Sequence, residues 1–337
     1  MKSTVITADS RNIHNYYIDI FRFLLILWIV LFHYTVQYNA LGLDKPFVFP
    51  YSFENGGTVG VSLFFMVSGF FMTKTLMSDK YGFREYGRYL ARRYLRLWIP
   101  YAFACIILYL WLLFLPVEGR TVDLSTLLAN VACVIHPGFD RVDNAHWFIA
   151  DLLVVQLLLG LLIFVRNNRY KQIIINCLFV IVMVAQVIHP PLLSGFSKEL
   201  FEVLLGTHIW MMVKDRDIRS LILTLIGLAV VVYLSIYMFI GAVVFFTIVL
   251  LGEKCPPQKS INGLALTFQF AGTISFYWYL VHQNIGYSIM YHYLPNDNNM
   301  YWLLIPMITT LGLSFLVYFF DNIINRFVIN RIHFLNK

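Results

Sequence analysis

The chain has 337 residues, of which 59% are hydrophobic and only 13% are charged, and its formal net charge is +7. Its apolar residues form runs of about 20, the length that crosses a bilayer as a helix. This composition excludes an ordinary soluble protein and indicates an integral membrane protein. The four cysteines form neither a CxxC motif nor a Cys/His ligand pattern, so the sequence predicts no disulfide framework and no metal site.

Hydropathy predicts membrane spans along the whole chain. They lie at 18–38, 57–77, 97–115, 146–165, 173–189, 199–213, 262–292 and 300–322. One further uncharged run, from Ser220 to Gly252, has 33 residues, which is too long for one ordinary span and short for two. If this run is a hairpin, the chain has ten spans with both termini in the cytoplasm. A short helix is expected at 124–135, within the longest outer segment.

The positions of the basic residues favour the hairpin. With ten spans, the cytoplasmic loops and tails carry 20 of the 25 lysines and arginines, and the outer side carries Lys45, Arg120, Arg141 and Lys198. This distribution obeys the positive-inside rule at every loop, whereas a single span would place the C-terminal tail on the wrong side. The basic excess is therefore interpreted mainly as a topology signal, and no nucleic acid is expected as a partner.

The predicted architecture is an all-α integral membrane protein, a single bundle of about ten transmembrane helices that forms one domain over 1–337. Residues 1–17 and 323–337 are expected to be short cytoplasmic tails. The competing class is a multi-span transporter or permease for a polar or anionic solute. Inverted repeats with paired broken helices would indicate that class, and none is visible in the sequence.

The first predicted span, IDIFRFLLILWIVLFHY, carries ionisable residues on one face. At about 100° per residue, Asp19, Arg22, His33 and Gln37 share an arc of about 60°. A charged side chain in mid-membrane costs about 2.5 to 3.5 kcal/mol on insertion scales, so such residues usually face a bundle interior and pair with one another. Arg22 and His33 are about 16 Å apart along the helix. The arc therefore predicts a polar seam that could hold an extended ligand.

Two simpler interpretations of these residues stay open. Asp19 and Arg22 could both lie at the inner headgroup level, where an arginine side chain can extend to water. His33 could be a hydrogen-bonded core histidine.

A second basic cluster precedes the third span, in REYGRYLARRYLRLWIPY. All of its basic residues are arginines, and Arg93 and Arg96 form an RxxR pair. A guanidinium group binds phosphate oxygens in a planar, bidentate way that lysine cannot match. The cluster therefore favours a phosphate site, with contact to anionic lipid as the alternative.

These motifs, together with three others in the same order, resemble the membrane acyltransferase 3 family. The resemblance covers essentially the whole chain. The motifs that carry it are IDIFRFLLILWIVLFHY, VSLFFMVSGFFM from Val61, RRYLRLWIPY with Pro100 opening the third helix, HWFIADLL from His146, and SFYWYLVHQNI from Ser275.

The resemblance implies transfer of an acyl group, commonly acetyl, from acyl-CoA in the cytoplasm to a hydroxyl group of a carbohydrate on the outer side. The expected donor is acetyl-CoA, the expected partners are a cell-surface or lipid-linked carbohydrate acceptor and membrane lipid, and no metal is expected. The protein is expected to be a multi-pass protein of the bacterial cytoplasmic membrane.

Roles for individual residues follow from the resemblance and the seam together. Arg22, Arg93 and Arg96 are expected to bind the phosphates of coenzyme A, and the pantetheine arm is expected to follow the seam outward. His33 is expected to be the general base, because a neutral imidazole is suited to accept a hydroxyl proton near pH 7. Asp19 is expected to orient Arg22.

The late motif adds a second catalytic candidate. His282 is expected at about the depth of His33, as a further acid or base or as an acceptor contact; the alternative is a histidine satisfied by neighbouring tyrosine and glutamine side chains. Ser68 beside Gly69 is interpreted as a site of close helix packing rather than as a nucleophile.

Acceptor binding is expected at the outer mouth of the fourth span, from His146, Trp147 and Asp151. Trp147 could equally be an interfacial anchor. Many family members have a glutamate a few residues after the tryptophan, whereas this chain has Leu152 there and Asp151 as the only nearby acid.

Overall fold

The computed structural model describes residues 15–43, 45–135, 140–188, 196–254, 262–295, 297 and 299–331. Within these residues the protein is helical throughout and has no strand, which confirms the predicted fold class. The long helices are α1 (Tyr16–Phe32), α2 (Gly56–Leu76), α3 (Phe83–Phe114), α5 (Trp147–Gly160), α6 (Asn168–Ile188), α7 (Ser197–Lys214), α8 (Ile218–Leu234), α9 (Ile236–Lys254), α10 (Asn262–Tyr293) and α11 (Leu304–Arg331). Eight helical segments of the described chain are long and apolar enough to cross a membrane, and α7 and α8 complete the predicted bundle of about ten.

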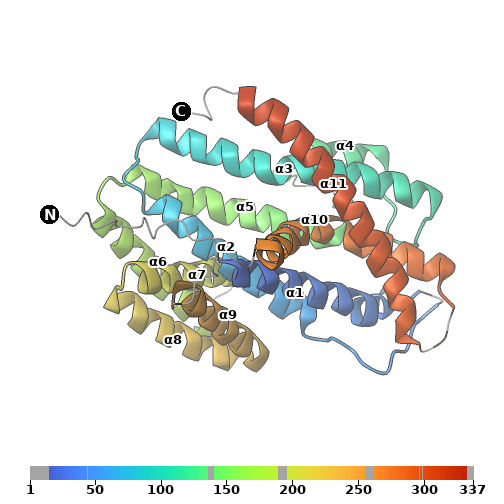
Figure 1. The fold of residues 1–337 in the computed structure, drawn as a ribbon, viewed down its shortest axis with the longest axis horizontal. Helices are drawn as coiled ribbons and strands as arrows, with labels where there is room; N and C mark the ends of the chain where they lie inside the picture. The colour runs from blue at the N-terminus through green and yellow to red at the C-terminus, as the bar shows by residue number, and fades with distance from the viewer. Residues whose placement is uncertain are drawn as a thin grey trace.

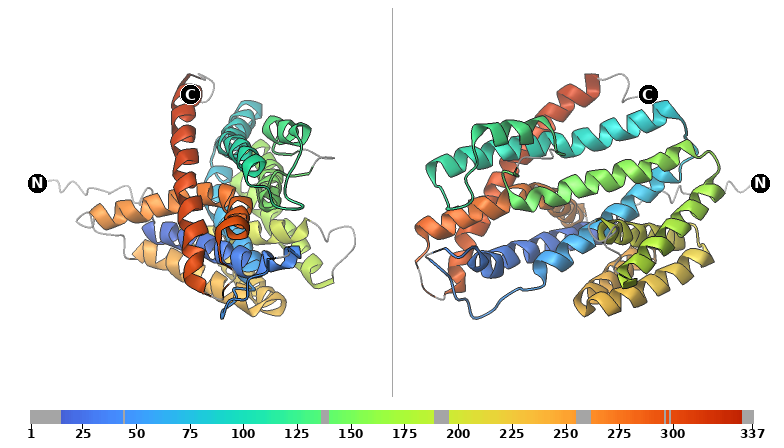
Figure 2. Two further views of the ribbon diagram at one scale, coloured as in Figure 1. Left: turned by 90° about the vertical axis from the view of Figure 1, so that its right-hand side faces the viewer. Right: turned by 180° about the vertical axis from the view of Figure 1, so that it is seen from behind.

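The helices are arranged around α1, α2 and α10 (Figure 1). Helix α1 packs between α2 and α10, and α2 packs on its other side against α7. Helices α6 to α9 form one flank of the bundle, and α3, α5 and the short helix α4 (Leu124–Ala132) form the opposite flank, as the two further views in Figure 2 also show. The polar face of α1 is therefore enclosed by other helices.

The uncharged run from Ser220 to Gly252 is a hairpin, as the distribution of basic residues predicts. Helix α8 ends at Leu234, Ser235 adopts an extended conformation, and α9 begins at the next residue. Lys214, the last residue of α7, precedes α8 closely and forms an ion pair with Glu253 near the end of α9. This contact places the start of α8 beside the end of α9, so the two helices run antiparallel.

Helix α3 begins earlier than hydropathy predicts. The predicted span starts at residue 97, whereas the helix starts at Phe83 and carries the whole arginine cluster on its first turns. Pro100 therefore lies inside the helix and does not open it. Hydropathy misses this start because charged residues end an apolar run without ending a helix.

Helices α2 and α7 cross at two glycines. A Cβ added at Gly69 would overlap the carbonyl oxygen of Val203, and a Cβ added at Gly206 would overlap the carbonyl oxygen of Met66. Each glycine thus receives the backbone of the partner helix, which is how small residues let membrane helices approach closely. This arrangement supports the packing interpretation of the Ser68–Gly69 pair.

The segment after α3, which is predicted to lie on the outer side, contains the short predicted helix, which runs from Leu124 to Ala132. Asp123 caps it by accepting a hydrogen bond from the backbone N–H of Thr126 at 2.8 Å. The hydrogen bonds from Thr126 lower the pKa of Asp123, because they favour the charged carboxylate.

The first and last helices are longer than the predicted terminal tails allow. Helix α1 begins at Tyr16 and α11 continues to Arg331, so both helices extend into the predicted tails. Residues 1–14 and 332–337 lie outside the described residues. The cytoplasmic location of both ends stays a prediction from the positive-inside rule.

Candidate functional site

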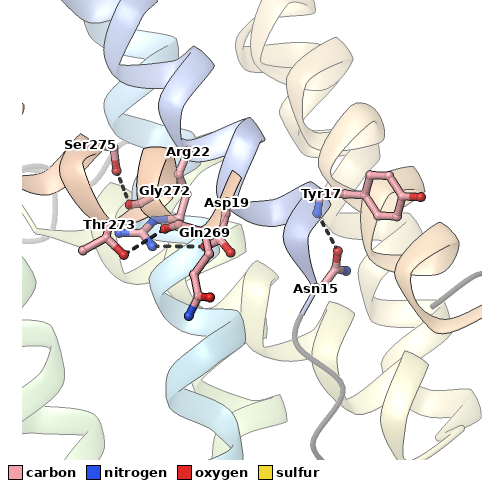
Figure 3. Close-up of polar contacts among 8 residues, drawn as sticks. All are labelled: Asn15, Tyr17, Asp19, Arg22, Gln269, Gly272, Thr273 and Ser275. Atoms are coloured by element: carbon pink, nitrogen blue, oxygen red, sulfur yellow. Dashed lines mark hydrogen bonds and ion pairs between the residues drawn. The ribbon is translucent and has the colours of Figure 1, made fainter. Parts of the chain in front are cut away.

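The polar face of α1 packs against α10. Asp19 is buried against Gly272, where an added Cβ would meet the aspartate side chain at 2.5 Å. Arg22 forms an ion pair with Asp19, with 3.7 Å between Nη1 and Oδ1. Figure 3 shows both side chains beside the turn of α10 that contains Gln269, Gly272 and Thr273. The glycine allows the charged pair to lie between the two helices.

At its C-terminal end, α1 changes into a π-helical turn that begins at His33. The turn, η2, spans His33–Gln37 and is closed by a hydrogen bond from the Tyr38 N–H to the His33 carbonyl oxygen at 2.8 Å. Such turns are rare, and they are frequent at functional sites because they alter the direction of side chains on the helix.

His33 lies next to His282 of α10. Their ring centroids are 5.0 Å apart, and His33 Nδ1 is 3.0 Å from the hydroxyl of Tyr287. His282 Nδ1 is 2.8 Å from the carbonyl oxygen of Tyr279 and must donate, because a carbonyl only accepts. In the neutral ring Nε2 therefore carries the lone pair, and it has no hydrogen-bond partner among the described residues. The two rings together can accept and return a proton.

The backbone around His282 is fixed by groups from other segments. The hydroxyl of Tyr34 donates to the His282 carbonyl oxygen at 2.9 Å. The carboxylate of Asp143, which is buried, accepts from the backbone N–H of Asn284 at 3.0 Å. The first contact holds α10 against the turn at the end of α1, and the second holds it against the loop before α5.

A cavity of about 530 Å³ lies at the start of α3. Its volume is within the range of about 300 to 1,000 Å³ that ligand pockets occupy. Arg93 lies over the ring of Tyr89, 5.5 Å from its centroid, and Arg88 donates to Glu85 at 3.0 Å. The cavity is called the inner cavity here, after the side of the membrane on which the positive-inside rule predicts it. It is lined by Lys74, Thr75, Ser78, Lys80, Glu85, Arg88, Tyr89, Arg92, Arg93, Arg96 and Ile163.

Arg22 is not among the described residues that line the inner cavity. Tyr277 lies within electrostatic range of both Arg22 and Arg96. The Tyr277 hydroxyl donates to Asp321 at 2.7 Å. Arg93 and Arg96 thus share one cavity, as the RxxR spacing predicts, whereas Arg22 belongs to a neighbouring polar cluster.

A second cavity, of about 340 Å³, lies at the C-terminal end of α1 and the N-terminal end of α2. It is called the outer cavity here, after the side of the membrane on which the positive-inside rule predicts it. It contains both His33 and Gln37 from the predicted seam. It is lined by Phe32, His33, Gln37, Gly57, Thr58, Val61, Ser62, Phe65, Arg120, Asn144, Ala145, Trp147, Lys198, Glu199, Glu202, Tyr279 and Gln283.

The two cavities are separate spaces. They have no described lining residue in common. Ile26, which lies between Arg22 and His33 on the same face of α1, is fully buried. The predicted seam is therefore polar at both ends and closed by packed side chains in the middle.

A family model described as an acyltransferase domain matches residues 15–319, which is nearly the whole chain. The chain belongs to the acyltransferase 3 family. It is thus a multi-pass membrane acyltransferase, and the transporter alternative loses its support. No curated protein and no solved structure matches the chain.

Of the three residues predicted to bind the acceptor of this acyltransferase, Trp147 lines the outer cavity, whereas His146 and Asp151 do not. Trp147 lines the outer cavity and is 36% exposed. His146 is buried, and its Nε2–H donates to the Leu280 carbonyl oxygen at 2.9 Å, so it fastens the loop before α5 to α10. Neither His146 nor Asp151 is among the described residues that line either cavity.

The outer cavity of the acyltransferase also contains charged residues that sequence analysis did not select. Glu202 is 1% exposed, lies 3.9 Å from Lys198, and has an Oε1 without a hydrogen-bond partner in the described chain. Glu199 lies one turn earlier on the same helix. Acids within a predicted span are by themselves a signal of function, and this signal was available at 199–213. Arg120 comes from a loop and carries no such signal.

Among the described residues of this acyltransferase, no group of three or more His, Cys, Asp or Glu side chains is arranged to bind a metal ion.

Proposed function

We propose that this acyltransferase transfers an acetyl group from cytoplasmic acetyl-CoA to a hydroxyl group of a cell-surface or lipid-linked carbohydrate on the outer side of the bacterial cytoplasmic membrane. The observation that carries the proposal is the pairing of an arginine-lined inner cavity with a histidine pair beside an outer cavity. The first suits the phosphates of a nucleotide donor, and the second suits a hydroxyl acceptor.

Donor binding begins in the inner cavity. Arg93 and Arg96 bind phosphate oxygens of coenzyme A through bidentate hydrogen bonds. Arg22, held by Asp19, attracts the same anionic part of the donor from the neighbouring cluster. Because Ile26 closes the seam, the pantetheine arm requires α1 and α10 to separate there when the donor binds.

Acyl transfer occurs beside the histidine pair. The acceptor oxygen forms a bond to the acyl carbon while His33 takes the hydroxyl proton. Collapse of the tetrahedral intermediate breaks the carbon–sulfur bond, and the proton passes to the leaving thiolate to give coenzyme A and an ester. The ring of His282 has a lone pair on Nε2, and its centroid is 5.0 Å from that of the His33 ring. His282 shares the proton during this exchange.

Arg93→Lys and Arg96→Lys are expected to weaken coenzyme A binding by roughly tenfold each, because a charge-assisted hydrogen bond contributes about 1.5 to 3 kcal/mol and lysine keeps only the charge. The measurement is calorimetric titration of the purified protein with coenzyme A, which requires no acceptor.

Arg84→Lys is the matched control for these variants. Arg84 is in the first turn of the same helix but is not a described lining residue of the inner cavity. The affinity of the Arg84→Lys variant for coenzyme A should therefore equal that of the wild type. Equal affinity in all variants would reduce the arginine cluster to a topology signal.

The overall function is tested by mass spectrometry of surface glycans from cells with and without the gene. Loss of an acetyl mass without the gene, restored by the wild-type gene and not by a His33→Ala gene, is the expected result. Glycan spectra that are identical in all strains would contradict transfer to a surface carbohydrate.

A further inference from the structure

Acyl transfer from a thioester creates negative charge on the carbonyl oxygen in the transition state. Enzymes stabilise this charge with preorganised hydrogen-bond donors or cations, and this is often the largest catalytic contribution. Since a histidine that acts as a base is neutral when the reaction starts, the histidine pair does not supply such a cation. If the proposed function is correct, another group in the outer cavity has to face the acyl oxygen.

Arg120 is placed for this task. It follows a turn in which Gly119 has a φ of 69°, and its backbone N–H donates to the Val117 carbonyl oxygen at 3.0 Å. Its guanidinium carbon is 5.7 Å from the ring centroid of Tyr287, the tyrosine whose hydroxyl lies 3.0 Å from His33 Nδ1. Tyr287 thus lies between the guanidinium group of Arg120 and the imidazole ring of His33, and both of these side chains line the outer cavity.

The guanidinium group of Arg120 retains hydrogen-bonding capacity. Its Nη1 is buried and has no hydrogen-bond partner in the part of the chain that the structure describes. A buried donor without a partner is costly and calls for an explanation such as a ligand. Arg120 also lies within electrostatic reach of His33, the expected base.

Lys198, the other described residue with a positive charge that lines the outer cavity, is less suited. Lys198 is one turn from Glu202 on α7, and the two side chains form an ion pair at 3.9 Å. The arginines of the inner cavity line a space that shares no described residue with the outer one.

We propose that Arg120 is a catalytic residue that donates to the carbonyl oxygen of the acyl thioester and stabilises the oxyanion of the tetrahedral intermediate. As the acceptor oxygen adds to the acyl carbon, the carbonyl electron pair moves onto that oxygen beside Arg120, and the hydroxyl proton moves to His33. The electron pair returns when the carbon–sulfur bond breaks, and the thiolate takes the proton. The inference rests on the proposed function.

An alternative role for Arg120 is recognition of an anionic group on the acceptor, such as a sugar carboxylate. The two roles differ in their dependence on the acceptor. An oxyanion-binding residue is needed whichever nucleophile attacks, water included, whereas a receptor for an acceptor anion is needed only when that acceptor binds.

The test uses the full-length protein in lipid nanodiscs with radiolabelled acetyl-CoA. Release of coenzyme A thiol is measured with water as the only nucleophile, and transfer of label is measured with polysaccharide extracted from the host envelope. For Arg120→Ala we expect kcat to fall by about 10²-fold in both assays, as after loss of one oxyanion donor, with an unchanged KM for acetyl-CoA. Arg120→Lys should recover part of the rate because it keeps the positive charge.

Arg141→Ala is the matched control, because Arg141 is also predicted to be an outer arginine but is not a described lining residue of the outer cavity. The melting temperature of each variant is measured to test whether it folds. An unchanged rate for folded Arg120→Ala overturns the proposal, and so does a higher KM for the polysaccharide with unchanged release of thiol to water. A wild-type protein without turnover in either assay overturns the proposed function and this inference together, whereas wild-type turnover with an unaffected Arg120→Ala variant overturns only the inference.

Discussion

His33→Ala is expected to abolish acetyl transfer while leaving coenzyme A binding intact. Removal of a general base typically lowers a rate by about 10²- to 10⁴-fold, and alanine leaves no group at this position to take the proton. Donor affinity should be unchanged, because His33 lines the outer cavity while the arginine cluster lines the inner one. The measurement is kcat for transfer of radiolabel to envelope polysaccharide, with calorimetric titration of coenzyme A on the same preparation.

His292→Ala is the matched control for His33→Ala. His292 lies at the exposed C-terminal end of α10 and its Nε2 donates to the Pro116 carbonyl oxygen at 2.8 Å, away from the histidine pair. Its kcat should match the wild type. Retained transfer by His33→Ala, combined with loss of transfer by His282→Ala, would reverse the two roles and make His282 the base.

The periodicity of α1 was sufficient to predict which of its faces is polar and enclosed. Asp19, Arg22 and His33 do face α10, because a helix keeps residues of similar angle on one side whatever surrounds it. The same reasoning could not show that Ile26 closes the seam. That closure depends on which side chains of the neighbouring helices pack against it.

The outer cavity was harder to predict because its lining comes from segments far apart in the chain. Arg120 follows α3 and Glu202 lies on α7, and the sequence around neither residue indicates that it shares a cavity with His33. His146 shows the opposite case: it was expected at the acceptor site because it precedes Trp147, but its side chain binds a backbone carbonyl of α10. Sequence neighbours on one helix turn can face different partners.

The helix boundaries show a similar limit. Hydropathy located the apolar part of the eight helical segments that are long and apolar enough to cross a membrane in the described chain, but it placed the start of α3 where the charges end. The charge distribution correctly resolved the hairpin of α8 and α9, because only that choice kept the basic loops on one side.

Gly69→Ala and Gly206→Ala are expected to destabilise the protein strongly, by about 3 kcal/mol or more each. Overpacking usually costs about 1 to 3 kcal/mol when side chains can move aside. Here the single added carbon would overlap backbone carbonyl oxygens, at Val203 for Gly69 and at Met66 for Gly206, which cannot move without displacing a helix. The measurement is the melting temperature and the folded yield of each variant in detergent, followed by size-exclusion chromatography.

Gly312→Ala makes the result specific to the helix crossing. Gly312 is inside α11, and an added Cβ there would have no described neighbour within 4 Å. Because alanine favours a helix interior over glycine by roughly 0.5 to 1 kcal/mol, this variant should be as stable as the wild type or slightly more stable. If Gly69→Ala and Gly206→Ala melt at the same temperature as Gly312→Ala, the close crossing of α2 and α7 is wrong.

The crossing variants should also lose transfer activity. Because α1 packs against α2, separation of α2 from α7 shifts one wall of the outer cavity.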